Sequence, residues 1–159
     1  MQINSTKMKT KYIALFAFLF LFSCDENKVF HQFDKNFESN RWLEKDIKTY
    51  DFTISEENKY DVVIEFSHVY DYDMATIPLV IKMKTPDGNE TTEKLDLPIK
   101  DETGKQLAEC SGDICDLYYT YKANQSFTKG EYSISIANTS AFGFLPNVIG
   151  VGLTVNKSK

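Results

Sequence analysis

Cys24 is the residue whose chemistry the sequence specifies most clearly. It follows Leu21-Phe22-Ser23 at the end of an uninterrupted apolar run, and a basic region with three lysines precedes that run. A small residue followed by cysteine here resembles the lipobox of a bacterial lipoprotein signal peptide, where the thiol takes a diacylglyceryl group and the chain is cut before it. We therefore predict a signal peptide over residues 1–23 and lipid attachment at Cys24.

The apolar run itself indicates export rather than a membrane span. Residues 12–22 are fewer than the roughly 20 apolar residues that a helix needs to cross a hydrocarbon core. Each buried lipid methylene contributes about 0.8 kcal/mol, so the several acyl chains of a lipidated cysteine would make attachment nearly permanent. The alternative is an ordinary secretory signal peptide in which Cys24 is coincidental.

Cys110 and Cys115, separated by Ser-Gly-Asp-Ile, form a second candidate site. In the oxidising compartment that export implies, two nearby cysteines tend to form a disulfide. The pair lacks the C-x-x-C spacing of redox-active sites, and no second pair of zinc ligands lies near it in the sequence. We expect a structural disulfide, with two free thiols, a redox-active pair or half of a metal site as the alternatives.

Side chains that could support catalysis or metal binding are few. The chain has two histidines, and His68 lies in a predicted strand without a recognisable catalytic motif around it. The pairs Asp71 with Asp73 and Asp113 with Asp116 could contribute to a calcium site, which needs six to eight oxygen ligands, or to a hydrolase with paired carboxylates. Solvated acidic loops are the simpler interpretation. We predict no catalytic residue, no cofactor and no metal.

Aromatic residues are abundant, with 12 Phe, 9 Tyr and 1 Trp in 159 residues. Most should pack in the core or at its boundary, although tyrosine and tryptophan also carry a polar group that seeks a partner. An exposed row of aromatic side chains could instead stack on sugar rings or bind a protein. The residues from which such a row could be drawn are Trp42, Tyr70, Tyr72, Tyr118 and Tyr121.

The hydrophobic pattern after residue 46 alternates with the period of a β-strand. In residues 47–54, for example, Tyr50, Phe52 and Ile54 share one face and polar residues occupy the other. Turn signals such as the Pro-Asp-Gly-Asn stretch at 86–89 separate the segments. We predict an all-β fold, an antiparallel β-sandwich of the jelly-roll or immunoglobulin-like type with about seven or eight strands. The main segments are 47–54, 60–69, 77–84, 91–99, 117–121, 132–136 and 148–155.

Length and charge indicate one acidic domain after the anchor. Removing residues 1–23 leaves 136 residues, with 15 basic and 23 acidic side chains because the signal peptide contributes three lysines and no acids. A net charge of −8 disfavours binding to nucleic acid. We predict a lipid-anchored tether over 24–45 and the sandwich over 46–159. Phe30, Phe33 and Phe37 in the tether recur at a spacing that fits a short helical turn or docking on the domain.

Taken together, these features resemble the GldH gliding-motility lipoproteins. The resemblance extends over essentially the whole chain after the signal peptide, and it rests on the order in which the matching blocks occur. Two stretches depart from the family pattern: Gln106-Leu107 with the cysteine loop, and Asn138-Thr139-Ser140 before the last block. The matching residues are Val29-Phe30, Trp42, Asp46, Pro86-Asp87-Gly88, Lys94-Leu95, Gly104-Lys105-Gln106-Leu107, Gly112-Asp113-Ile114, Phe127, Gly130-Glu131-Tyr132 and the block 145–153.

The resemblance implies a non-enzymatic lipoprotein of the cell envelope, held on a membrane by its lipid, with the outer membrane favoured and the domain facing the periplasm or the cell surface. Its implied partners are other envelope proteins of the gliding apparatus, which shares parts with the type IX secretion system. The alternative function is that of a surface glycan-binding lipoprotein with an aromatic platform.

Overall fold

The computed structural model describes residues 27–159, so Cys24 and the predicted signal peptide lie outside the described residues. Within 27–159 the chain forms eleven strands and one short 3-10 turn. In chain order they are β1 (Lys28–Lys35), η1 (Glu38–Asn40), β2 (Trp42–Leu43), β3 (Lys48–Ile54), β4 (Asn58–Val69), β5 (Thr76–Lys84), β6 (Glu90–Pro98), β7 (Glu109–Ser111), β8 (Ile114–Phe127), β9 (Gly130–Asn138), β10 (Phe144–Leu145) and β11 (Val148–Lys157).

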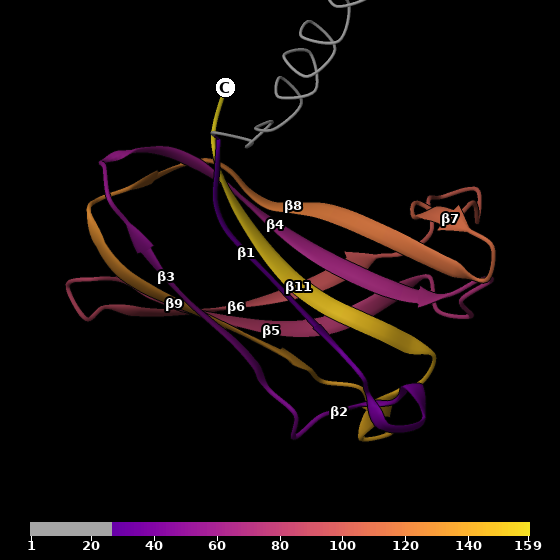
Figure 1. Cartoon of the computed structure of the whole chain (residues 1–159). Helices are drawn as coiled ribbons and strands as arrows, with labels where there is room; N and C mark the ends of the chain where they lie inside the picture. The colour runs from indigo at the N-terminus through magenta and orange to yellow at the C-terminus, as the bar shows by residue number, and fades with distance from the viewer. Residues whose placement is uncertain (1–26) are drawn as a thin grey trace, which may run out of the picture.

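The long strands form two antiparallel sheets that pack face to face (Figure 1). The five-stranded sheet has the order β1-β11-β4-β8-β7, the four-stranded sheet has the order β3-β9-β5-β6, and β2 pairs separately with β10. Without the short β2, β7 and β10, eight strands remain, in the orders β1-β11-β4-β8 and β3-β9-β5-β6, with the first strand, β1, beside the last, β11. This is the strand order of a jelly roll. The predicted antiparallel β-sandwich is therefore confirmed, and its strand order selects the jelly-roll type.

The core lies between the sheets and follows from the alternation of apolar residues. Tyr50, Phe52 and Ile54 of β3 point inward as predicted, and β4, β5, β9 and β11 contribute further inward rows. The seven predicted segments correspond to β3, β4, β5, β6, β8, β9 and β11. The phenol of Tyr50 crosses the core and donates a hydrogen bond to the carbonyl of Val151 in the opposite sheet at 3.0 Å. Burial raises the pKa of this phenol, so it stays protonated as a donor.

The segment predicted as a tether is placed differently by the structure. β1 pairs with β11 along its whole length, from Lys28 opposite Asn156 to Lys35 opposite Gly150. Phe30 faces inward and packs on Phe52 of the four-stranded sheet, with ring centroids 5.4 Å apart. Residues 28–35 are therefore an edge strand of the sandwich rather than a tether, and the phenylalanine docks on the domain without forming a helix.

Residues 36–47 are also part of the folded domain. Trp42 is fully buried, and its indole Nε1 donates to the carbonyl of Asp46 at 2.7 Å. The side-chain amide of Asn138 donates to the carbonyl of Trp42 at 3.1 Å, which joins this segment to the end of β9. The rings of Phe37 and Trp42 pack at 6.2 Å. This segment closes the end of the sandwich that lies far from Lys28.

Two glycines of β11 make room for an aromatic side chain on the outer face of the five-stranded sheet. Phe33 of β1 lies opposite Gly152, and its ring covers Gly150 and Gly152. A Cβ atom at Gly150 would lie 2.2 Å from Cζ of Phe33, and one at Gly152 would lie 2.6 Å from Cδ2. Glycine in a strand interior often marks such a close approach, and here it lets β1 lie against β11.

Replacing Gly150 with alanine is expected to lower the free energy of unfolding by about 1–3 kcal/mol, because the added methyl group overlaps the Phe33 ring. In the double variant Phe33→Ala/Gly150→Ala the ring is absent, so the two losses should fall short of additivity. Urea unfolding of the wild type, both single variants and the double variant measures this coupling. Strictly additive losses would contradict the proposed contact.

Candidate functional site

Cys110 and Cys115 lie directly opposite each other in the β7–β8 hairpin and are joined by a disulfide. Cys110 is exposed and Cys115 is buried, so the bridge connects the surface to the boundary of the core. Gly112, in the turn between the two strands, has a φ of +62°, a conformation that glycine adopts without steric cost. The disulfide therefore fixes a short hairpin at one corner of the five-stranded sheet.

His68 and Tyr72 lie inside the domain rather than in a surface site. The ring centroids are 5.0 Å apart, and Nδ1 of His68 donates to the carbonyl of Val69 at 2.9 Å. Nε2 of His68 and the hydroxyl of Tyr72 are buried and have no hydrogen-bond partner among residues 27–159. Burial lowers the pKa of His68, which therefore packs as a neutral core residue near neutral pH.

The acidic pairs occupy loops and a strand at the end of the sandwich that carries β7. Asp71 and Asp73 lie between β4 and β5, where Asp71 adopts a φ of +56°. Asp113 follows Gly112 in the hairpin turn, and Asp116 lies in β8. Among the described residues, no group of three or more His, Cys, Asp and Glu side chains is arranged to hold a metal ion.

The aromatic row considered from the sequence does not exist on the surface. Trp42 and Tyr72 are buried, and the hydroxyl of Tyr121 donates to Glu93 at 2.9 Å across the edge of the sandwich. Tyr70 and Tyr118 are exposed. The expected core packing is therefore confirmed for Trp42 and Tyr72, and the two exposed tyrosines do not make up the aromatic row of the glycan-binding alternative.

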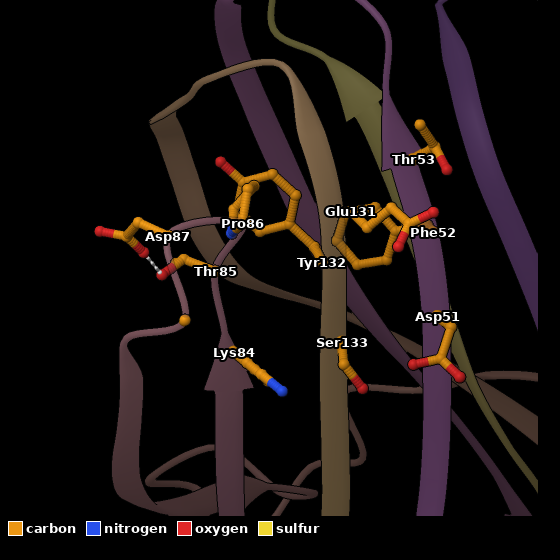
Figure 2. Close-up of a pocket in the computed structure, with 11 residues that line it drawn as sticks. Asp51, Phe52, Thr53, Lys84, Thr85, Pro86, Asp87, Glu131, Tyr132 and Ser133 are labelled. Carbon is orange, nitrogen blue, oxygen red and sulfur yellow. Dashed lines mark hydrogen bonds between the residues drawn. The ribbon is translucent and has the colours of Figure 1, made fainter.

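An open groove of about 810 Å³ lies on the outer face of the four-stranded sheet (Figure 2). The strand register brings together side chains that are distant in sequence: Asp51 of β3 and Lys84 of β5 both lie opposite Ser133 of β9. Thr53 lies opposite Glu131 in the next row. Polar alternation in each strand predicts this outer face, but the sequence did not reveal which strands are neighbours.

The turn that borders this groove is held by internal hydrogen bonds and carries an ionised carboxylate. The Thr85 hydroxyl donates to the Asp87 carboxylate, and the backbone N–H of Asn89 donates to it at 3.2 Å. These bonds hold the pKa of Asp87 below its usual value, so it is a poor proton donor near neutral pH. Pro86 packs on Gly130, where a Cβ would meet the ring at 2.6 Å. The groove presents hydroxyls and charges, without a histidine or cysteine in its lining.

A second groove of about 300 Å³ lies on the outer face of the five-stranded sheet. The two glycines leave a depression beside Phe33, and β4 and β8 form the opposite wall. His31 contacts Glu65 at 3.2 Å, and the Ser67 hydroxyl donates to Asp116. In register across the sheet, one row contains Phe33, Gly152, Glu65 and Tyr118, and the next contains Lys35, Gly150, Ser67, Asp116 and Glu109.

A sequence profile of the GldH lipoprotein family matches residues 28–155, which is nearly all of the domain. The chain belongs to the GldH lipoprotein family. This confirms the resemblance found in the sequence, and family membership implies a lipid-anchored protein of the cell envelope. No helix within residues 27–159 is both long and apolar enough to cross a bilayer.

Two relatives show how far the similarity extends. The gliding motility lipoprotein GldH of Flavobacterium johnsoniae is 24% identical over 131 residues, which cover 82% of this chain and 80% of that protein. A GldH homolog of Christiangramia forsetii, also named as a gliding motility lipoprotein, is 23% identical over 156 residues, covering 92% of this chain and 94% of the relative. The similarity to both relatives therefore extends over most of their length.

The buried His68 should make folding sensitive to mild acid. Its pKa is lowered in the folded state, mainly by burial, so the unfolded chain binds the proton more readily. Stability should therefore decline as the pH falls through about 6.5, the ordinary histidine value. In His68→Phe this part of the decline should disappear, whereas the exposed His31→Gln serves as the control. Urea unfolding between about pH 7.5 and 5.5 measures the difference; equal slopes in wild type and His68→Phe would contradict it.

Proposed function

We propose that this chain is a non-catalytic lipoprotein of the gliding-motility apparatus and its associated type IX secretion system, attached to a membrane through lipidated Cys24 and acting as a protein-interaction module. Family membership and the gliding-motility names of two relatives that match most of their length support the biological setting. We further propose that residues 1–23 are removed as a signal peptide and that the outer membrane holds the anchor.

The observation that carries the mechanism is the short distance between the anchor and the first strand. Cys24 precedes Lys28, the first residue of β1, by four positions. At up to about 3.6 Å per residue, this connection spans at most about 14 Å. The sandwich would therefore stand directly on the membrane with a restricted range of orientations. Such restriction raises the effective concentration of one face toward neighbouring envelope proteins.

The two grooves support a binding role rather than catalysis. Both are open surfaces. In the second, the Ser67 hydroxyl donates to Asp116, but among residues 27–159 no third side chain hydrogen-bonds to that carboxylate to orient it as a base. His31 at the second groove contacts Glu65, which also accepts from the Thr154 hydroxyl; within residues 27–159 neither His31 nor Glu65 is hydrogen-bonded to a serine or cysteine. A rigid jelly roll with polar faces is suited to presenting contacts to a partner.

Cys24→Ala tests the anchor and the assembly role together. The wild-type chain should incorporate labelled palmitate and sediment with membranes, whereas the variant should do neither, because it lacks the acylated thiol. Mild crosslinking followed by affinity recovery from native membranes should yield gliding or secretion-system components with the wild type and fewer with the variant. Mass spectrometry of the recovered proteins makes the comparison quantitative.

Two results would overturn this proposal. Continued membrane attachment and labelling of Cys24→Ala would place the anchor elsewhere. Retention of the wild type on a polysaccharide array, without recovery of any envelope protein, would replace the motility role with glycan capture. Ser135→Ala is the matched control, because Ser135 is a small polar residue on an outer sheet face far from Cys24 in the sequence. This variant should recover the same envelope proteins as the wild type, in equal amounts.

A further inference from the structure

Apolar side chains are exposed on the five-stranded sheet at its β7–β8 corner. Tyr118 is 62% exposed, and Ile114 is 44% exposed and lies opposite Val69 in the β4–β8 ladder. Tyr70, the residue after Val69, is 60% exposed. Its backbone N–H donates to the carbonyl of Asp113 in the hairpin turn at 2.9 Å, which places it beside Ile114. Exposed apolar groups gathered at one corner of a sheet are typical of an interaction surface.

Three carboxylates lie near Tyr118. Glu109 of β7 lies directly opposite Asp116 of β8, and Glu65 of β4 lies directly opposite Tyr118. Partial burial, and then the negative charges of these three acids, raise the pKa of the Tyr118 phenol. Like charges directly opposite each other destabilise a strand pair. The hairpin therefore carries an unfavourable arrangement on its outward face.

The described residues provide no lysine or arginine partner for these acids. Glu65 contacts His31 and accepts from the Thr154 hydroxyl, and Asp116 accepts from Ser67. Within 27–159 the exposed Glu109 side chain forms no ion pair or hydrogen bond. Lys35 in the same row lies over the Phe33 ring, 5.3 Å from its centroid. The disulfide in the adjacent row holds β7 against β8 despite the repulsion.

We propose that this corner docks a cationic segment of a partner protein, with lysine or arginine side chains between Phe33 and Tyr118 and against Glu65, Asp116 and Glu109. Arginine and lysine are attracted both to carboxylates and to aromatic faces, so the two kinds of residue found here attract the same ligand group. The proposal deepens the interaction role proposed above and rests on it.

The position of the corner argues against lipid as its occupant. The ladder between β4 and β8 runs from Asn58 opposite Phe127 to Val69 opposite Ile114. The Asn58 end lies beside the start of the described chain, since the backbone N–H of Ser158 donates to the carbonyl of Lys59 and that of Lys157 to the carbonyl of Asn27. At about 3.3 Å per residue, the row of Glu65 and Tyr118 lies about 23 Å from Asn58, and Val69 lies about 36 Å from it. Figure 1 shows β7 far from the C-terminus. The acids would also repel lipid phosphates.

A photo-crosslinking phenylalanine in place of Tyr118, in the full chain within its own membranes, tests the proposal. It should form an adduct with one envelope protein, and the attachment site should lie in a segment rich in lysine or arginine. The same residue in place of Ser135, on the outer face of the other sheet, should not form that adduct. Glu109→Lys should reduce the adduct by about three-fold or more, because it reverses a charge at an exposed ionic contact.

Further controls separate docking from folding and anchoring. Glu109→Lys should unfold at an equal or higher temperature than the wild type, because it replaces repulsion with attraction. Asp51→Lys, an equal charge change in the groove of Figure 2, should leave the adduct unchanged. Replacing the crosslinked lysine or arginine of the partner by glutamate should restore the adduct with Glu109→Lys.

An adduct that is unaffected by Glu109→Lys would overturn the proposal, as would an adduct with lipid, with glycan or with a second copy of this chain. These outcomes differ from failure of the proposed function. A wild-type chain that stays anchored through Cys24 and recovers gliding components, but yields no charge-dependent adduct at position 118, retains its assembly role and loses this docking site.

Discussion

The pairing of β1 with β11 is the constraint on which the rest of the structure depends. In a jelly roll the first and last strands are neighbours, so the beginning of the domain at Lys28 and its end at Lys157 share one end of the sandwich. This pairing fits closely because Gly150 and Gly152 leave space for Phe33. If Cys24 is lipidated as proposed, the start of β1 at Lys28 leaves a connection of only four positions, which would restrict the orientation of the domain on the membrane.

That orientation gives the two outer faces different surroundings. The groove bordered by the Thr85–Asn89 turn lies toward the end of the sandwich where β1 begins, whereas the β7–β8 corner lies at the opposite end. The first is lined by hydroxyls and mixed charges, and the second combines exposed apolar groups with acids. Under the proposed anchoring at Cys24, the first surface would lie nearer the membrane than the second, so contacts at one would not compete with contacts at the other.

Sequence patterns predicted the strands in which buried residues alternate regularly with more exposed ones. Alternation in β3, β4 and β9 identified strands and inward residues such as Tyr50 and Ile134, and the order of turn glycines and apolar blocks suggested the family. β1 was missed because it is an edge strand, half-buried on both faces, and lacks a clean alternation. The strand register could not be predicted from the sequence, because it depends on which segments pair. Examples are Glu109 opposite Asp116, and Asp51 and Lys84 on either side of Ser133.

The disulfide illustrates how a structural element can serve an interaction surface. A loop closed by residues only five positions apart removes little entropy from the unfolded chain, so the bridge contributes modestly to global stability. Its larger effect is local, because it maintains a row in which two carboxylates face each other. A chain selected for stability alone would place an opposite charge or a neutral residue at position 109. Retaining both acids beside exposed Tyr118 makes sense if a cation from outside the chain completes the row.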